Sequence, residues 1–208
     1  MRKFFLSVFL IFTLTQSFSQ NEGLLEFSKS YFRANPFEGK FSLFLKKLIQ
    51  DPNISSKVIR HQTDTSLFFF SGVYTTYNPF FFKPVRVEVL LQQSRIAFVD
   101  SLEADTIFTY QLRGYADKTE KGEAEVKKEM AKIHRQYVKK FFDSNSQDLN
   151  IPGTIGIVTN YFVPFSGLSP LSVFWTNSQN KDDPLLCLVL RFKMSENEAV
   201  LAAPLNNP

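Results

Sequence analysis

The order of two periodicities along the chain restricts its fold more than any other feature, because a helical pattern precedes a group of strand-like segments twice. In residues 38–50, apolar side chains recur at the spacing of one helix face, and the Asp51–Pro52 pair ends the pattern. Residues 120–142 form a second, longer helical segment, and residues 24–33 are a short helix or lead-in. The positions predicted for the buried face of the longer helix are Val126, Met130, Ile133, Tyr137 and Phe141.

Three strand-like segments follow each of the two main helical segments. The first group is residues 67–74, 85–99 and 108–113, and the second is residues 154–163, 171–176 and 185–193. Val85, Val87 and Val89 alternate with polar residues, which is the period of a half-buried strand. The sequence therefore predicts an α+β fold in the order helix–βββ–helix–βββ, with a mainly antiparallel sheet packed by helices. This order also allows two copies of one αβββ unit, although no repeat is visible residue by residue.

The first 19 residues have the three parts of a signal peptide. Arg2 and Lys3 are basic, residues 4–14 are mostly apolar, and Ser17 and Ser19 supply the small side chains before a cut at Gln20. The apolar run is about half the roughly 20 residues that a membrane-spanning helix needs. We therefore expect a secreted or periplasmic protein without a transmembrane span in its mature chain. Loss of the two cations would lower the net charge from +4 to +2.

The remaining residues, 20–208, fit a single globular domain with a frayed tail from about residue 203. Of the 24 phenylalanines in the sequence, 19 lie in these residues, and they are expected to supply much of the core, since each aromatic ring buries roughly 150–250 Å². Cys187 is the only cysteine, so an intramolecular disulfide is excluded. Its apolar neighbours predict a buried, unreactive thiol.

No stretch of the sequence specifies a reaction. Dinucleotide-binding, P-loop and nucleophile-elbow motifs are absent, so no cofactor is expected. The segments that begin at Asp64 and Asp100 approach the aspartic-protease motif, but neither has its glycine, and both are typical of capped turns. His61 and His134 have no second histidine or cysteine nearby to complete a metal site. These observations predict a non-enzymatic protein, with a hydrolase whose site assembles from scattered residues as the alternative.

The predicted helix over residues 120–142 also carries a basic stripe opposite its apolar face. The stripe consists of Lys121, Lys128, Lys132, Arg135 and Lys139. Glu125 and Glu129 flank it at salt-bridge spacing, a pattern typical of the solvated face of an ordinary surface helix. Together with export, this argues against a nucleic-acid partner.

Residues 74–84 form the most unusual stretch, in which two prolines bracket three consecutive phenylalanines. In an extended segment Phe80 and Phe82 would share one side, and Phe81 would take the other. Exposed rings would form an apolar patch of the kind that marks an interface, whereas rings folded back would fill an edge of the core. The candidate interaction surface consists of Tyr74, Tyr77, Phe80, Phe81 and Phe82. The sequence thus predicts a binding module with a protein or envelope partner, or else a structural component of an envelope assembly.

Overall fold

The computed structural model describes residues 23–61, 67–97, 104–141, 143–162, 171–180, 183 and 185–195. The helices are residues 23–31, α2 (Phe41–Gln50) and α3 (Glu120–Tyr137), and α3 continues into a 3-10 turn at Val138–Lys140. The strands are β1 (Ile54–Arg60), β2 (Phe69–Tyr74), β3 (Arg86–Ala97), β4 (Ala104–Asp117), β5 (Asp143–Asp148), β6 (Thr154–Phe162), β7 (Leu171–Ser178) and β8 (Leu185–Ser195).

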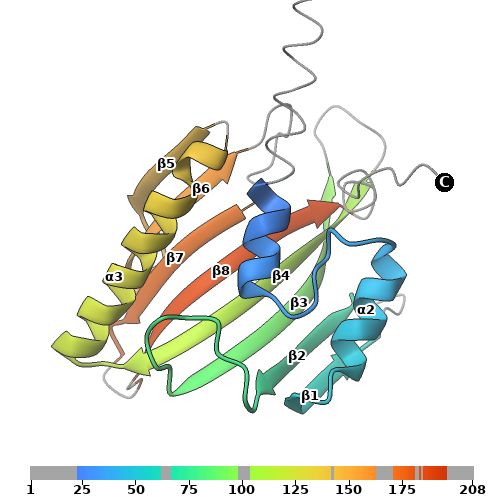
Figure 1. Ribbon diagram of the computed structural model, residues 1–208, viewed down its shortest axis with the longest axis horizontal. Helices are drawn as coiled ribbons and strands as arrows, with labels where there is room; N and C mark the ends of the chain where they lie inside the picture. Colours follow the sequence, from blue (N-terminus) through green and yellow to red (C-terminus); the bar gives the residue numbers. More distant parts are fainter. Residues whose placement is uncertain are drawn as a thin grey trace, which may run out of the picture.

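All eight strands belong to one antiparallel sheet in the order β1-β2-β3-β4-β8-β7-β6-β5 (Figure 1). Strands β1 to β4 follow one another across one half, α3 leads to the other edge, and β5 to β8 return toward the middle. The halves meet where β4 pairs with β8, in a register that runs from Ile107 opposite Ser195 to Asp117 opposite Leu185. The two long central strands therefore join segments that lie far apart in the sequence.

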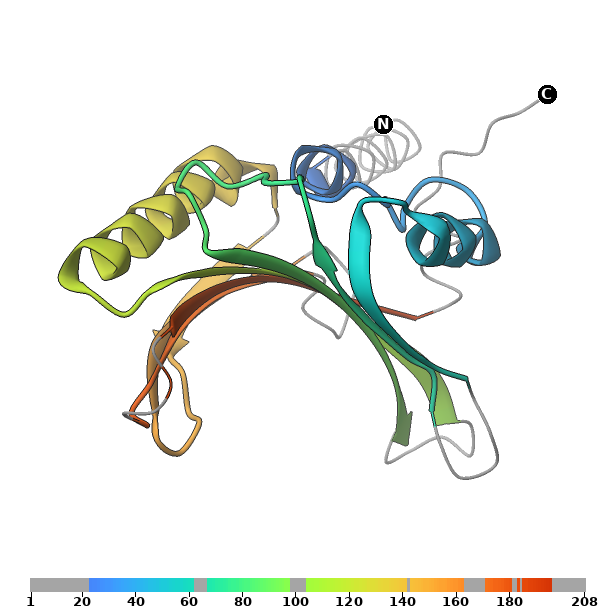
Figure 2. The ribbon, with the colours of Figure 1, turned by 90° about the horizontal axis from the view of Figure 1, so that it is seen from below.

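The helices cover only one face of this sheet. Figure 2 shows the sheet bent into an arch, with α2, α3 and the helix over residues 23–31 on its outer side. No described helix lies on the inner, concave side, which we call the open face. Side chains that point away from the helices therefore line a broad concave surface.

The α+β class and the antiparallel sheet packed by helices are as predicted, but the order helix–βββ–helix–βββ is wrong. Each half has four strands, so the αβββ unit and its duplication are not found. The missed strands are β1 and β5, which form the two edges of the sheet. β5 has the sequence Asp-Ser-Asn-Ser-Gln-Asp and contains no apolar residue, while in β1 only Ile54 is buried. Strands of this kind show no apolar periodicity in the sequence. They do not need one, because backbone pairing with a single neighbour holds them at the edge of the sheet.

The predicted helix faces are confirmed, although α3 ends at Tyr137, before the predicted end at residue 142. All five positions predicted for the buried face are buried, Phe141 among them just beyond the 3-10 turn, and α2 buries Phe41, Phe44 and Leu48 before it ends at Gln50. The start of α3 is fixed by Thr119, whose side-chain oxygen accepts a hydrogen bond from the Gly122 N–H at 3.0 Å. Helix faces follow from local spacing, which explains why the sequence is sufficient to locate them.

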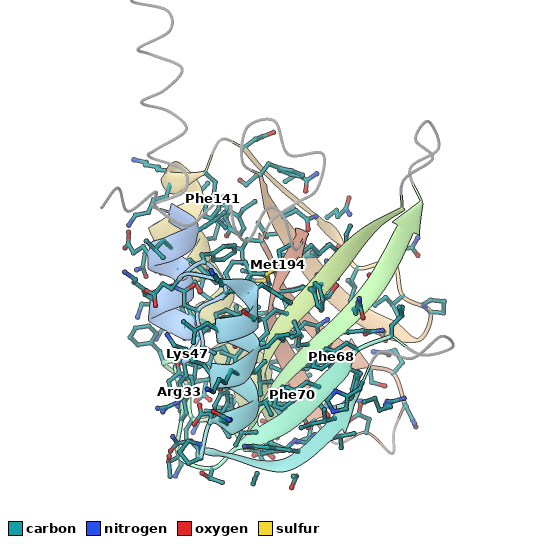
Figure 3. The ribbon with its side chains drawn as sticks, turned by 90° about the vertical axis from the view of Figure 1, so that its right-hand side faces the viewer. Arg33, Lys47, Phe68, Phe70, Phe141 and Met194 are labelled. Carbon is teal, nitrogen blue, oxygen red and sulfur yellow. The ribbon has the colours of Figure 1, made fainter. Side chains whose placement is uncertain are left out.

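Aromatic rings fill the space between the helices and the sheet, as the composition predicts. Tyr110 of β4 packs against Phe32 and Phe44, with ring centroids 4.8 and 5.0 Å apart. Phe192 of β8 packs against Phe27 and also contacts Phe32. Figure 3 labels two further rings of this layer, Phe70 and Phe141, and the side chain of Met194, which belongs to the same core. The central strands thus hold the helices through one continuous aromatic core.

Candidate binding site

The structure does not gather the five predicted aromatic residues on one exposed surface. Tyr74, Phe80 and Phe82 are buried in the core, and Tyr77 is half-buried. Phe81 is 70% exposed, so the predicted alternation of the three phenylalanines is confirmed. Only one ring of the candidate surface is therefore open to a partner.

The segment that carries Phe81 is held by polar groups on both of its sides. Within it, the Phe80 N–H donates to the Asn78 side-chain oxygen at 2.9 Å, and the Asn78 amide donates to the Phe82 carbonyl at 3.1 Å. From α3, the Glu129 carboxylate accepts the Phe81 N–H at 3.1 Å, and the Lys132 ammonium stands over the Phe81 ring. These contacts fix the direction in which Phe81 projects.

Glu129 is buried beneath this segment with one carboxylate oxygen unpartnered. Burial raises the pKa of its carboxyl, although the Phe81 N–H and the Lys132 charge act in the opposite direction. A raised folded-state pKa means that the charged form destabilises the fold, and that this penalty disappears as the pH falls through the pKa.

We therefore expect Glu129→Gln to have a melting temperature a few degrees higher than the wild type at pH 7. The difference should shrink toward pH 4, and thermal unfolding at both pH values measures it. Glu125→Gln on the same helix is the control, and a lower melting temperature for Glu129→Gln at pH 7 would contradict the expectation.

The open face carries a row of polar side chains that crosses several strands. Gln111 lies opposite Arg191, which lies opposite Ser172, and the row continues through Asn160 to Asn145. Arg191 donates to the Ser172 hydroxyl at 3.1 Å, and that hydroxyl donates to the Asn160 side-chain oxygen at 2.8 Å. The Asn160 amide donates in turn to Asn145 at 3.3 Å. This ladder gives the open face a defined polar surface in place of a second apolar layer.

Three cations stand on β4 and β8 at the middle of the open face, namely Arg113, Arg191 and Lys193. None of the ion pairs among the described residues includes any of them. Burial lowers the pKa of the Arg191 guanidinium, and burial together with the Arg191 charge lowers the pKa of Lys193. The centre of this face thus holds half-buried positive charge without a paired carboxylate.

A pocket of about 390 Å³ opens beside these cations. We call it the open-face pocket; its lining includes Arg113, Tyr115, Phe174, Thr176, Cys187 and Val189. Phe174 and Val189 form a small apolar cluster with Val158, separate from the main core, and Cys187 packs against it. The pocket therefore combines an apolar floor with a cationic wall.

Cys187 is half-buried on the open face, not enclosed in the main core. Burial raises the pKa of its thiol to about 12, and the nearby Arg113 charge only partly offsets that effect. The thiol is therefore protonated at neutral pH, in agreement with the expected low reactivity.

The residues considered for catalysis are not brought together by the described part of the chain. His134 shares a hydrogen bond of 3.1 Å with the Tyr161 hydroxyl, while His61 is exposed near the Phe68 ring. Asp64 and Asp100 lie outside the described residues, as do the predicted signal peptide and the C-terminal tail. Across the described ranges, no group of three or more His, Cys, Asp or Glu side chains could hold a metal ion.

The predicted basic stripe lies on the outer side of α3, where Lys121 pairs with Glu125 at 4.0 Å. None of the described helices is both long enough and apolar enough to cross a membrane.

Sequence patterns did not identify the open-face pocket. Arg113 follows the buried Leu112 in β4, and Arg191 and Lys193 flank the buried Phe192 in β8, so the three cations alternate with core residues. That alternation shows which residues leave the core, but not that β4 and β8 are neighbours. The site therefore depends on a pairing between the two halves that no local pattern encodes.

Comparison of the chain with protein-family models, with curated proteins and with solved structures finds no match. The site must therefore be interpreted from its own geometry.

Proposed function

We propose that this protein is an exported, non-enzymatic binding module whose ligand occupies the open face of the sheet. The observation that carries the proposal is the open-face pocket, an apolar floor beside half-buried cations on a face that no described helix covers. Pockets of about 300–1,000 Å³ with a few placed polar groups are typical of small-molecule sites. The row of polar side chains and the cations without a paired carboxylate add little to the stability of the fold, but they suit the recognition of a ligand.

The experiment is native mass spectrometry of the protein purified from cells that export it naturally. We expect a bound small molecule on the wild type, and its loss in Thr176→Trp, because the added indole ring fills the pocket that Thr176 lines. Thr76→Trp, the same substitution at an exposed position between β2 and β3, is the matched control and should keep the ligand. A ligand that persists in Thr176→Trp would show that the open-face pocket is not its site.

Export is part of the same proposal and is checked separately. N-terminal sequencing of the exported protein should begin at or within a residue or two of Gln20, because Ser17 and Ser19 place the cut there. A mature chain that begins at Met1 would contradict both the export and the lowered net charge.

We also retain the aromatic segment as a proposed second contact surface for a protein or envelope partner, reduced to Phe81 and the Lys132 ammonium over its ring. Hydrogen bonds already fix the backbone segment that carries the exposed Phe81 ring. Little conformational entropy is therefore lost there when a partner binds. If this surface is used, Phe81→Ser should weaken association with the partner while leaving thermal stability nearly unchanged. Two alternatives remain as proposals. A hydrolase would show turnover, and a structural envelope component would assemble, in each case through residues other than Phe81 and Lys132.

A further inference from the structure

We propose that the open-face pocket binds a small organic anion with one carboxylate head and an apolar body, the head bound by Arg113 and the body lying over Phe174, Val189 and Cys187. The inference rests on the proposed binding function and adds the chemical class of the ligand. It requires a guanidinium with free N–H donors, a second positive charge nearby that favours a bound anion, and an apolar surface for the body of the ligand.

Arg113 supplies the free donors. Its Nε and one Nη donate to the Gln111 side-chain oxygen at 2.9 and 2.8 Å, which fixes the position of the guanidinium beside Gln111. A guanidinium has five N–H donors, so three of them stay available for a carboxylate. Gln111 is neutral, and Glu88, which lies opposite Arg113, is already bound by Arg86 at 3.0 Å and by the Tyr115 hydroxyl at 2.7 Å. Arg113 thus keeps both its charge and a bidentate edge for an anion.

Arg191 provides an independent indication that an acceptor belongs at this face. Its Nε is buried and has no hydrogen-bond partner, while its guanidinium lies 5.0 Å from the Phe174 ring centroid. In the register of β4 and β8, Arg113 faces Val189, so Arg191 is its diagonal neighbour two residues further along β8. Two guanidiniums on diagonal positions repel each other, and a bound anion would relieve that repulsion.

The remaining lining selects the body of the ligand and the number of its charges. Phe174, Val189 and Cys187 form an apolar floor. Asp183 also lines the pocket, and its carboxylate accepts a hydrogen bond from the Leu185 N–H at 3.3 Å. Its carboxylate disfavours a second negative group there. The pocket therefore suits a monocarboxylate with a compact apolar body better than a dicarboxylate or a phosphate monoester, each of which carries a second negative charge.

The test is isothermal titration calorimetry of the purified protein with phenylacetate, phenylacetamide and acetate. Phenylacetate should bind, and phenylacetamide, which lacks the charge, should bind roughly tenfold or more weakly. Acetate, which lacks the ring, should also bind at least about tenfold more weakly, because it buries far less apolar surface. Equal affinity for phenylacetate and phenylacetamide would overturn the carboxylate head, and equal affinity for phenylacetate and acetate would overturn the apolar body.

Variants assign the effect to the site. Arg113→Gln should weaken phenylacetate roughly 10- to 100-fold, and Arg113→Lys should keep part of the affinity because it retains the charge but not the fork. Arg135→Gln, an exposed position on α3 across the sheet, removes the same charge and should leave the affinity unchanged. Equal binding by Arg113→Gln and Arg135→Gln, both with wild-type melting temperatures, would overturn the inference. Absence of phenylacetate binding by the wild type would also overturn the inference. The proposed binding function fails separately, if native mass spectrometry finds no small molecule on the wild type or finds it retained in Thr176→Trp.

Discussion

Phe80→Ala is expected to lower the free energy of unfolding by about 3–5 kcal/mol, whereas Phe81→Ala, one residue away, should cost about 1 kcal/mol or less. Phe80 is 5% exposed and Phe81 is 70% exposed, so the same chemical change removes core packing in one case and a surface ring in the other. Urea unfolding of both variants followed by circular dichroism measures the difference.

The large effect at Phe80 follows from how closely its ring approaches β4. A Cβ placed on Gly114 would come within 2.5 Å of the Phe80 ring, so the ring lies directly on the backbone of a central strand. Gly114→Ala should therefore also destabilise, and its effect should not add to that of Phe80→Ala, because removal of the ring makes room for the methyl group. Additive effects in the double variant, or equal costs at Phe80 and Phe81, would show that this packing does not hold.

Ile133→Ala should lower the free energy of unfolding by about 2–5 kcal/mol, because Ile133 is fully buried on the face of α3 that packs against the sheet. Lys128→Ala on the outer face of the same helix is the matched control and should change stability by about 0.5 kcal/mol or less. Both changes introduce alanine, which has the highest helix propensity, so propensity cannot explain a loss of stability at Ile133. Denaturant midpoints that move equally for the two variants would contradict the assignment of the helix faces.

The contrast between α3 and the edge strands shows which parts of the fold can be read from the sequence. The buried face of α3 follows from residues three and four positions apart, so Ile133 and Tyr137 could be placed without any tertiary information. Strand β5 has no such pattern, because all six of its side chains are polar and the strand is held in the sheet by backbone pairing with β6. Counting strands from hydrophobic alternation therefore misses the edges of the sheet and changes the predicted topology.

The aromatic segment was predictable only in part for a related reason. Alternation along a segment between two prolines predicts that Phe81 points away from Phe80 and Phe82, and the burial of the three rings agrees. Which side faces the core depends on Gly114 of β4, which leaves space for Phe80, and on Glu129 of α3, which binds the Phe81 N–H. These residues are distant in sequence, so local patterns cannot choose between an exposed patch and an edge of the core.

The sequence by itself determined the α+β class, the helix faces, the central strands and the absence of an intramolecular disulfide, because each depends on composition or on neighbours a few residues apart. Only the tertiary structure decided that β4 and β8 lie side by side, that all the described helices cover one face, and that Arg113 and Arg191 are diagonal neighbours on the other. The physical reason is that strand pairing is non-local: backbone hydrogen bonds can join any two strands, and the free energy of burying the whole core selects among the pairings. The candidate site lies on that selected pairing, at the junction of the two halves of the chain.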